Sequence, residues 1–248
     1  MLLSTKGVAG TKLEGKDATL GQVHDLLFDD ESWLVRYLVI DTGTWLPGRR
    51  VILRPQDVDR RDWTRRTLHS RRTKREIEQS PPLSEHEPVS RQHEARMSAH
   101  FLWSHPGPVG PASVSGVGGA PATRAEAATA VVDEADGDPH LRSVDEVRGY
   151  RIHATDGEIG HVEDLVVDDS SDEWRIRYLV VDTRNWLPGR KVLVATGWAD
   201  DVSWDSREVR IDLERQVVKD SPEFDPSQPV NRRYAEQLYD YYGRPAYW

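Results

Sequence analysis

Apolar and polar residues alternate with a period of two in two segments, residues 19–29 (TLGQVHDLLFD) and 158–168 (EIGHVEDLVVD). Shortly after each comes a segment rich in β-branched and aromatic residues, VRYLVID at 35–41 and IRYLVVD at 176–182. A period of two predicts β-strands, and β-branched and aromatic side chains favour them. The pattern therefore predicts a chain built mainly from strands.

The sequence Leu-Pro-Gly-Arg occurs at residues 46–49 and again at residues 187–190. Each time a further apolar segment follows it. Proline fixes its own φ and glycine accepts a positive φ, which suits the two central positions of a type II turn. Residues 203–213 add a hairpin, and residues 214–222 (ERQVVKDSP) then add a short helical closing turn. Five or six short strands in about 75 residues predict an all-β fold of two small closed or half-closed barrels.

The two sets of segments are copies of each other. Three tryptophan or aspartate pairs match at a constant spacing of 141 residues: Trp33 with Trp174, Asp41 with Asp182, and Trp45 with Trp186. Gly21 matches Gly160 at a spacing of 139, because the second copy has two more residues in the turn before Trp174. An insertion at that place is typical of a surface loop.

The repeat continues past the β-rich part, because residues 88–103 align with residues 229–244. Ser90 and Asn231 suit helix N-caps, so each copy is expected to carry a helical tail. The segment between the copies is rich in Gly, Pro and Ala, a composition typical of a flexible linker. The expected organisation is barrel 1 at 1–82, helical tail 83–105, linker 106–140, barrel 2 at 141–225, and helical aromatic tail 226–248.

Several apolar residues are left without an obvious place in a single small barrel. A barrel has one packed interior, so the second apolar face of each central strand needs cover from a tail, the other copy or a partner chain. A tryptophan before a surface turn either anchors an interface or closes one end of the barrel. The candidate protein-interface residues are Trp45, Leu46, Pro47, Trp186, Leu187, Pro188, Leu38, Ile40, Leu179, Val181, Tyr234, Leu238, Tyr241 and Tyr242. The two barrels are expected to pair within the chain, and a homodimer using the same surfaces is the alternative.

The amino-acid composition excludes several kinds of site and a membrane-spanning segment. The 248 residues include no cysteine, which excludes disulfides, thiol catalysis and cysteine-ligated metals. No apolar run approaches the roughly 18 residues that a membrane span requires, and the first residues lack the apolar region of a signal peptide. We therefore expect a soluble, cytoplasmic protein without an integral membrane segment. The tail is tyrosine-rich rather than basic, which disfavours an interfacial membrane helix.

The net charge of −9 is unevenly distributed. Residues 1–80 hold 15 Lys and Arg against 12 Asp and Glu, whereas residues 139–225 hold 12 against 20. The basic segment 60–75 could track phosphates, so an RNA- or ribosome-associated role is an alternative. The protein as a whole is acidic and repels polyanions such as RNA at long range. This favours the interpretation that the basic segment simply faces solvent.

No catalytic set repeats between the copies. Asp41 and Asp182 follow the central strands, and each is expected to accept backbone N–H bonds from the next loop. Arg49 and Arg50, like Arg190 and Lys191 in the second copy, follow the Pro-Gly turn, where they either bind an anion or are solvated. The histidines of the first tail (His86, His93, His100 and His105) could hold a divalent metal, but tyrosines replace two of them in the second copy. We expect no cofactor, no metal and no enzymatic activity.

The pattern DGEIGHVEDLVVDDSSDEWRIRYLVVDT with WLPGRKVLV in the second copy resembles the PRC-barrel family. Both copies carry this pattern, over roughly residues 6–80 and 147–222. This family is named for the cytoplasmic domain of the photosynthetic reaction-centre H subunit and includes the barrel of a ribosome maturation factor. The resemblance implies a barrel used as a protein-docking platform. The expected function is a non-enzymatic adaptor or assembly module, with an H-subunit-like role at a photosynthetic membrane complex as a further alternative.

Overall fold

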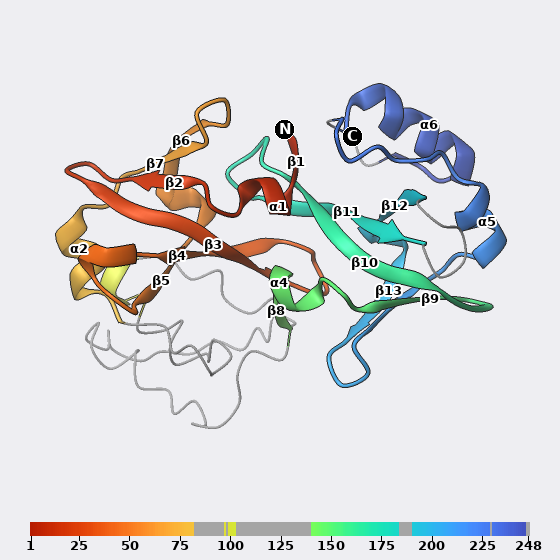
Figure 1. Cartoon of the computed structure of the whole chain (residues 1–248), viewed down its shortest axis with the longest axis horizontal. Coiled ribbons are helices and arrows are strands. Elements are labelled where there is room, and N and C mark those ends of the chain that lie inside the picture. Colours follow the sequence, from red (N-terminus) through yellow and green to blue (C-terminus); the bar gives the residue numbers. More distant parts are fainter. Residues whose placement is uncertain (82–96, 98, 103–139, 184–189, 229, 247–248) are drawn as a thin grey trace, which may run out of the picture.

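The computed structural model describes residues 1–81, 97, 99–102, 140–183, 190–228 and 230–246. In these residues the protein is mostly β, with one mixed sheet for each copy of the repeat, seen left and right in Figure 1. We call residues 1–81 the first domain and residues 140–228 the second domain.

The first domain begins with β1 (Leu2–Ser4) and the single helical turn α1 (Thr5–Val8). Its remaining elements are β2 (Lys12–Glu14), β3 (Thr19–Asp29), β4 (Val35–Asp41), a 3-10 turn at Gly43–Trp45, β5 (Arg50–Leu53), a 3-10 turn at Pro55–Asp57, β6 (Val58–Asp62), β7 (Thr67–Ser70) and α2 (Lys74–Gln79).

The second domain repeats this order, beginning with β8 (Leu141–Ser143) and α4 (Val144–Val147). It continues with β9 (Arg151–Ala154), β10 (Gly157–Asp168), β11 (Arg175–Asp182), β12 (Lys191–Ala195), a 3-10 turn at Thr196–Trp198, β13 (Ala199–Ser203), β14 (Glu208–Ile211) and α5 (Arg215–Asp220). The tail helix α6 (Arg232–Tyr242) follows.

The strand order is the same in both sheets: β5-β4-β3-β2-β7-β6 and β12-β11-β10-β9-β14-β13. Only the pairs β2–β7 and β9–β14 are parallel within the described strands, and the other pairs are antiparallel. In the described residues no strand pairing joins β5 to β6 or β12 to β13, so each sheet is open between its two outer strands.

The first strand of each domain pairs with the sheet of the other domain. β1 pairs antiparallel with β10 of the second domain, with Leu3 opposite Val167. β8 pairs antiparallel with β3 of the first domain, with Arg142 opposite Phe28. Figure 1 shows both crossings near the middle of the molecule, with β1 on the second sheet and β8 below β3. We call residues 2–8 and 141–147 the exchanged segments.

A second backbone contact joins the domains between the two crossings. The Val35 amide donates to the Trp174 carbonyl at 2.8 Å, and the Ile176 amide donates to the Trp33 carbonyl at 2.8 Å. These two bonds pair the starts of the central strands β4 and β11 around the bridge between Leu34 and Arg175. The two domains are thus related by an approximate twofold arrangement of their contacts.

The repeated glycine of the long strands has a steric reason. A Cβ on Gly21 would lie 2.1 Å from the Asp41 carbonyl oxygen, and a Cβ on Gly160 would lie 2.1 Å from that of Asp182. Their φ angles of +147° and +141° also disfavour other residues. The pair therefore marks a close approach of neighbouring strands that both domains need.

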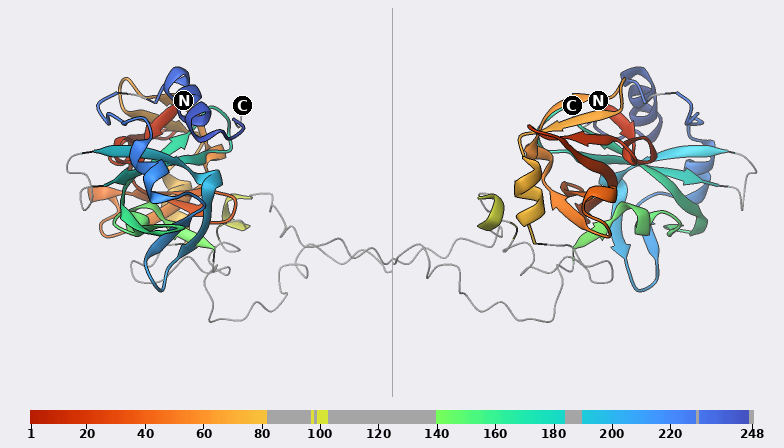
Figure 2. Two further views of the ribbon diagram at one scale, coloured as in Figure 1. Left: turned by 90° about the vertical axis from the view of Figure 1, so that its right-hand side faces the viewer. Right: turned by 60° about the vertical axis from the view of Figure 1, so that its left-hand side comes forward.

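The tails pack on the domains that precede them. In α6, dark blue at the upper end of the second domain in Figures 1 and 2, Leu238 is fully buried and Tyr239 is 7% exposed. Asn231 caps the helix by accepting from the Tyr234 amide at 2.9 Å, as the sequence predicts. In the described part of the first tail, Met97 and Phe101 are buried in the core.

Candidate functional site

Two aspartates in equivalent positions, Asp164 and Asp25, accept hydrogen bonds from the exchanged segments. Ser4 closes β1, and both its hydroxyl and that of Thr5 donate to the Asp164 carboxylate, the latter at 2.6 Å. The Lys6 amide points to the same carboxylate at 3.3 Å. Asp164 on β10 thus receives the first helical turn of α1 from the other domain.

Asp25 on β3 does the same for the second exchanged segment. The Ser143 hydroxyl donates to Asp25, and the Asp145 amide donates to it at 3.2 Å. The Leu26 amide adds a third bond at 2.8 Å. Ser143 also caps α4, as Ser4 caps α1, so serine fixes the turn and the crossing together.

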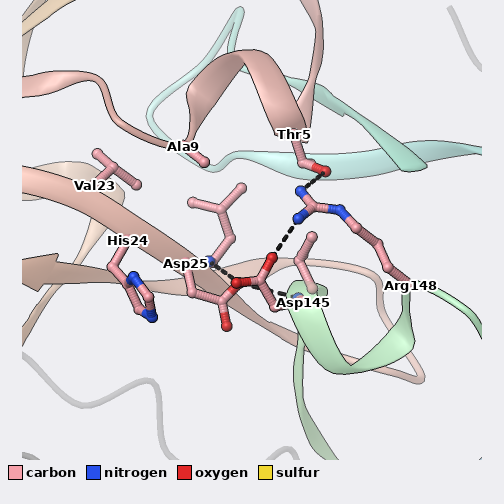
Figure 3. A pocket seen from close by; sticks show the side chains of 9 residues that line it. Thr5, Ala9, Val23, His24, Asp25, Asp145 and Arg148 are labelled. Carbon is pink, nitrogen blue, oxygen red and sulfur yellow. Dashed lines mark hydrogen bonds and ion pairs between the residues drawn. The ribbon is translucent and has the colours of Figure 1, made fainter. Parts of the chain in front are cut away.

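One arginine makes the two ends different. Arg148 donates to the Asp145 carboxylate and, at 2.9 Å, to the Thr5 hydroxyl, and its Nε lies 3.4 Å from the Asp164 carboxylate. Figure 3 shows its guanidinium between Thr5 and Asp145. The equivalent residue of the first copy is Ala9, which carries no charge.

The electrostatics of Asp25 follow from this difference. Its side chain is 9% exposed, and no ion pair to it occurs among the described residues. Burial raises the pKa of the Asp25 carboxyl, and the nearby Asp145 carboxylate raises it further, against the lowering effect of the Ser143 hydroxyl. The Asp25 end is therefore the less favourable place for a negative charge.

The pocket drawn in Figure 3 lies between these groups and includes His24, Asp25, Asp145 and Arg148. It is a shallow depression whose enclosed space does not hold a water molecule. Asp25, Asp145 and Arg148 are engaged in holding the exchanged segments. We therefore interpret it as part of the contact between the domains rather than as a substrate site.

The β6–β7 hairpin of the first domain also reaches the second domain. The Trp63 indole donates to the Asp169 carboxylate at 2.6 Å, and its ring lies 6.0 Å from that of Trp174. Arg61 donates to the Asp169 carbonyl at 2.7 Å and pairs with Asp172 at 3.1 Å. Asp172 belongs to the loop that the second copy has extended by two residues, so the extended loop supplies part of this contact.

The equivalent β13–β14 hairpin of the second domain is different. Trp204 matches Trp63, yet it is 57% exposed, and its indole donates to Glu146 of its own domain. Val202 replaces Arg61 and Asp201 replaces Arg60. Asp200, Asp201 and Asp205 on this hairpin are exposed, as are Arg207 and Arg210, so its surface combines an indole with a small excess of acidic groups.

The interface candidates around the two Pro-Gly turns differ in exposure and in how much of them the structure describes. Trp45 is half-buried, donates from its indole to the Leu20 carbonyl at 3.0 Å and lies under the Lys74 ammonium at 4.6 Å. Leu46 is half-buried and Pro47 is exposed. Trp186, Leu187 and Pro188 lie outside the described residues. Trp45 thus has its ring against its own domain.

The four central-strand candidates, Leu38, Ile40, Leu179 and Val181, are each 0% exposed. They belong to the core and offer no surface to a partner. The cross-domain contacts described above lie instead at the exchanged segments, the starts of β4 and β11, and the β6–β7 hairpin.

The tail tyrosines lie on the second domain. Tyr234 donates to the Pro222 carbonyl at 3.0 Å, and the Tyr241 hydroxyl donates to the Val217 carbonyl at 2.8 Å. Burial raises the pKa of Tyr242 to about 12, so this phenol is uncharged at neutral pH. The Tyr242 ring centroid lies 4.5 Å from that of Trp198.

Several basic residues of segment 60–75 are used within the protein. Besides Arg61, Arg66 donates to the Ala9 carbonyl at 2.7 Å, and Arg72 pairs with Asp57 at 2.6 Å. These contacts remove three guanidinium groups from a surface that could follow phosphates.

The other polar candidates also have structural partners. Asp41 accepts from the Gly43 amide at 2.8 Å, which is the loop bond expected of it. Arg49 donates to the Glu78 carbonyl at 2.9 Å, and Arg190 donates to the Ser221 carbonyl, so both guanidinium groups hold the end of a following helix. Of the tail histidines, His86, His93 and His105 lie outside the described residues, and within the described part no group of three metal-ligating side chains occurs.

Comparison with known proteins gives no family assignment: no family model matches the chain, and no curated protein matches it. Among the described residues, no helix is long and apolar enough to cross a membrane.

Sequence reasoning missed the exchange and the different surroundings of Trp63 and Trp204. The sequence does show that the two exchanged segments are copies of each other. Residues 2–10 (LLSTKGVAG) match residues 141–149 (LRSVDEVRG) at four positions. The shared residues are Leu2 and Leu141, Ser4 and Ser143, Val8 and Val147, and Gly10 and Gly149. No strand period reveals that these segments pair with the opposite copy.

Proposed function

We propose that the protein is a non-enzymatic docking module that binds another protein through the β13–β14 hairpin of its second domain. The observation that supports this is the exposed side chain of Trp204, 57% exposed, at a position whose copy in the first domain is used for binding. Exposed tryptophans are costly to solvate and are enriched among the residues that dominate interfaces.

The internal copy supports the kind of contact as well as its place. Trp63 shows that this hairpin can bind a protein surface by inserting an indole beside a charged pair. On the β13–β14 hairpin three exposed aspartates, Asp200, Asp201 and Asp205, outnumber two exposed arginines. The partner expected is therefore a protein surface that carries basic residues. The resemblance to PRC barrels, whose implied role is docking, agrees with this proposal, and we propose the PRC-type barrel as the family fold of each domain.

No observation within the described residues favours the RNA-associated or photosynthetic alternatives over docking. Arg61, Arg66 and Arg72 bind groups of the protein itself, which weakens the case for a phosphate-tracking surface.

The test is site-specific photo-crosslinking in an extract of the source cells. A photoreactive phenylalanine derivative replaces Trp204 in one variant and Thr64, near the equivalent tip of the first hairpin, in a control. We expect a defined protein to crosslink at position 204 and not at position 64. The same protein should be retained by the unmodified protein and lost at least tenfold from Trp204→Ala, with the thermal midpoint of that variant unchanged. Identical crosslinking at both positions, or equal retention by Trp204→Ala, would refute the proposal.

A further inference from the structure

The contacts between the two domains do not depend on both domains belonging to one chain. Every one described above joins residues 1–81 to residues 140–228: β1 with β10, β8 with β3, Val35 with Trp174, and Trp63 with Asp169. Two different chains can make each of these contacts with the same atoms. The only difference is the path of the connecting residues.

Neither domain is complete without the other. The end of β3, Leu27 to Asp29, pairs with β8, and the end of β10, Val166 to Asp168, pairs with β1. Without the partner domain these strand ends present open edges, which readily accept another strand. Trp174 is 0% exposed in the assembled molecule, with the Trp63 ring and the Arg61 guanidinium beside it, so separation uncovers a large apolar ring.

Chain connectivity favours pairing within one chain only by a finite factor. Phe101 is packed in the core with the Arg72 guanidinium 4.5 Å from its ring, so the connection between the domains runs from about residue 103 to residue 139. Residues 103–139 lie outside the described residues, and their Gly-, Pro- and Ala-rich composition predicts a flexible linker, for which a root-mean-square span of roughly 35 Å is expected. Such a tether corresponds to an effective concentration on the order of millimolar. Pairing between chains becomes comparable as the protein concentration approaches that value.

We propose that a second copy of this chain is a binding partner, through reciprocal exchange. The first domain of one chain pairs with the second domain of the other, and the reverse, so that the dimer contains two complete sets of the contacts seen in the single chain. The interacting surface is formed by the exchanged segments, residues 2–8 and 141–147, with Asp164 and Asp25 as their receivers. This dimer is closed by a twofold axis and leaves both Trp204 side chains exposed.

The absence of cysteine in the sequence permits a direct test with engineered disulfides. Leu2 and Asp168 face each other between β1 and β10, and Leu141 and Asp29 face each other between β8 and β3. In the neighbouring residue pairs, the Asp169 amide donates to the Met1 carbonyl and the Asp30 amide donates to the His140 carbonyl. The two pairs chosen for substitution are therefore non-hydrogen-bonded pairs, in which side chains are closest. The test variants are Leu2→Cys with Asp168→Cys and, separately, Asp29→Cys with Leu141→Cys. The control is Asp41→Cys with Arg50→Cys, opposite residues within the first domain.

Each variant is refolded at protein concentrations from about 1 μM to about 1 mM, oxidised, and separated on a denaturing gel without reductant. At low concentration we expect a disulfide within one chain for all three pairs. With increasing concentration, a two-chain product should appear for both cross-domain pairs and not for the control.

The proposal is overturned if the cross-domain pairs give only one-chain disulfides at every concentration. Failure of these pairs to form any disulfide would overturn it as well, since the exchange would then be absent. The proposal does not rest on docking at Trp204, so loss of either leaves the other intact. Light scattering of the unsubstituted protein over the same concentrations provides a second measurement, with an average mass that rises from the monomer mass towards twice that mass at the upper end.

Discussion

Asp25 and Asp164 show how one residue substitution changes equivalent sites of a repeat. Both accept hydroxyl and amide hydrogen bonds from an exchanged segment, but among the described residues only Asp164 has a guanidinium beside it, that of Arg148. A buried carboxylate without a cation is disfavoured relative to its neutral form. The two ends of the contact between the domains therefore respond differently to pH and to neutralisation.

Replacing Asp25 with Asn should raise the free energy of unfolding at pH 7. The amide retains acceptors for Leu26 and Asp145 and a donor for the Ser143 hydroxyl, while the buried charge is removed. Because the folded-state pKa of Asp25 is above the unfolded value, its contribution is most favourable below the unfolded pKa and is lost as pH rises through the folded pKa. The advantage of Asp25→Asn should therefore shrink between neutral and acidic pH. Urea unfolding at pH 7, 5.5 and 4 measures this, and a gap that widens towards acid would contradict it.

Replacing Asp164 with Asn should have the opposite sign and serves as the matched control. The Arg148 guanidinium loses a carboxylate 3.4 Å away, and the Ser4 and Thr5 hydroxyls lose a charged acceptor. Hydrogen bonds to charged groups contribute about 1.5 to 3 kcal/mol, so we expect a loss of about 2 kcal/mol at pH 7. Urea unfolding measures the loss, and a stability equal to that of Asp25→Asn would show that Arg148 does not distinguish the two sites.

At the scale of elements, the two hairpins separate a structural tryptophan from an exposed one. Trp63→Ala removes a half-buried indole, its bond to Asp169 and its contact with Trp174, so the free energy of unfolding should fall by about 3 kcal/mol. Trp204→Ala should change it by less than about 0.5 kcal/mol, as for most surface substitutions. Thermal and urea unfolding of both variants measure the difference. Equal losses would mean that Trp204 is as tightly packed as Trp63.

The sequence predicts elements well where the information is local. The strands at 19–29 and 35–41, the N-cap at Asn231 and the loop bond of Asp41 follow from period, propensity and side-chain chemistry over a few residues. The central strands are buried on both faces, as their apolar composition indicates, but that composition does not say what covers them. Leu38 and Ile40 are expected to need cover from a tail, the other copy or a partner chain, and in the structure both are fully buried within the chain.

The exchange of first strands depends on pairings between residues more than 100 positions apart. An exchanged strand and a strand folded back on its own domain have the same alternation of side chains, so no local pattern separates them. The same holds for Trp63 and Trp204, which are identical residues in matching positions. Their surroundings differ because of the two-residue loop insertion and the replacement of Arg61 by Val202, which act only after the domains meet.

The whole molecule should unfold as one cooperative unit. Each sheet is completed by a strand from the other domain, so loss of one domain opens an edge and uncovers core residues in the other. Calorimetry should show a single transition with matching calorimetric and van't Hoff enthalpies. Trp63→Ala should shift that transition to lower temperature without splitting it. Two resolved transitions in the unsubstituted protein would show that the domains are independent.

The pairing of β8 with β3 also has a consequence during synthesis. The strand that covers the end of β3 lies at residues 141–143, so the ribosome completes α2 about 60 residues before that strand exists. At 5 to 20 residues per second, the nascent first domain waits about 3 to 12 seconds with this edge uncovered. Within a polysome, neighbouring nascent chains hold the same incomplete edge at high local density, and the order of translation thereby influences which chain supplies the missing strand.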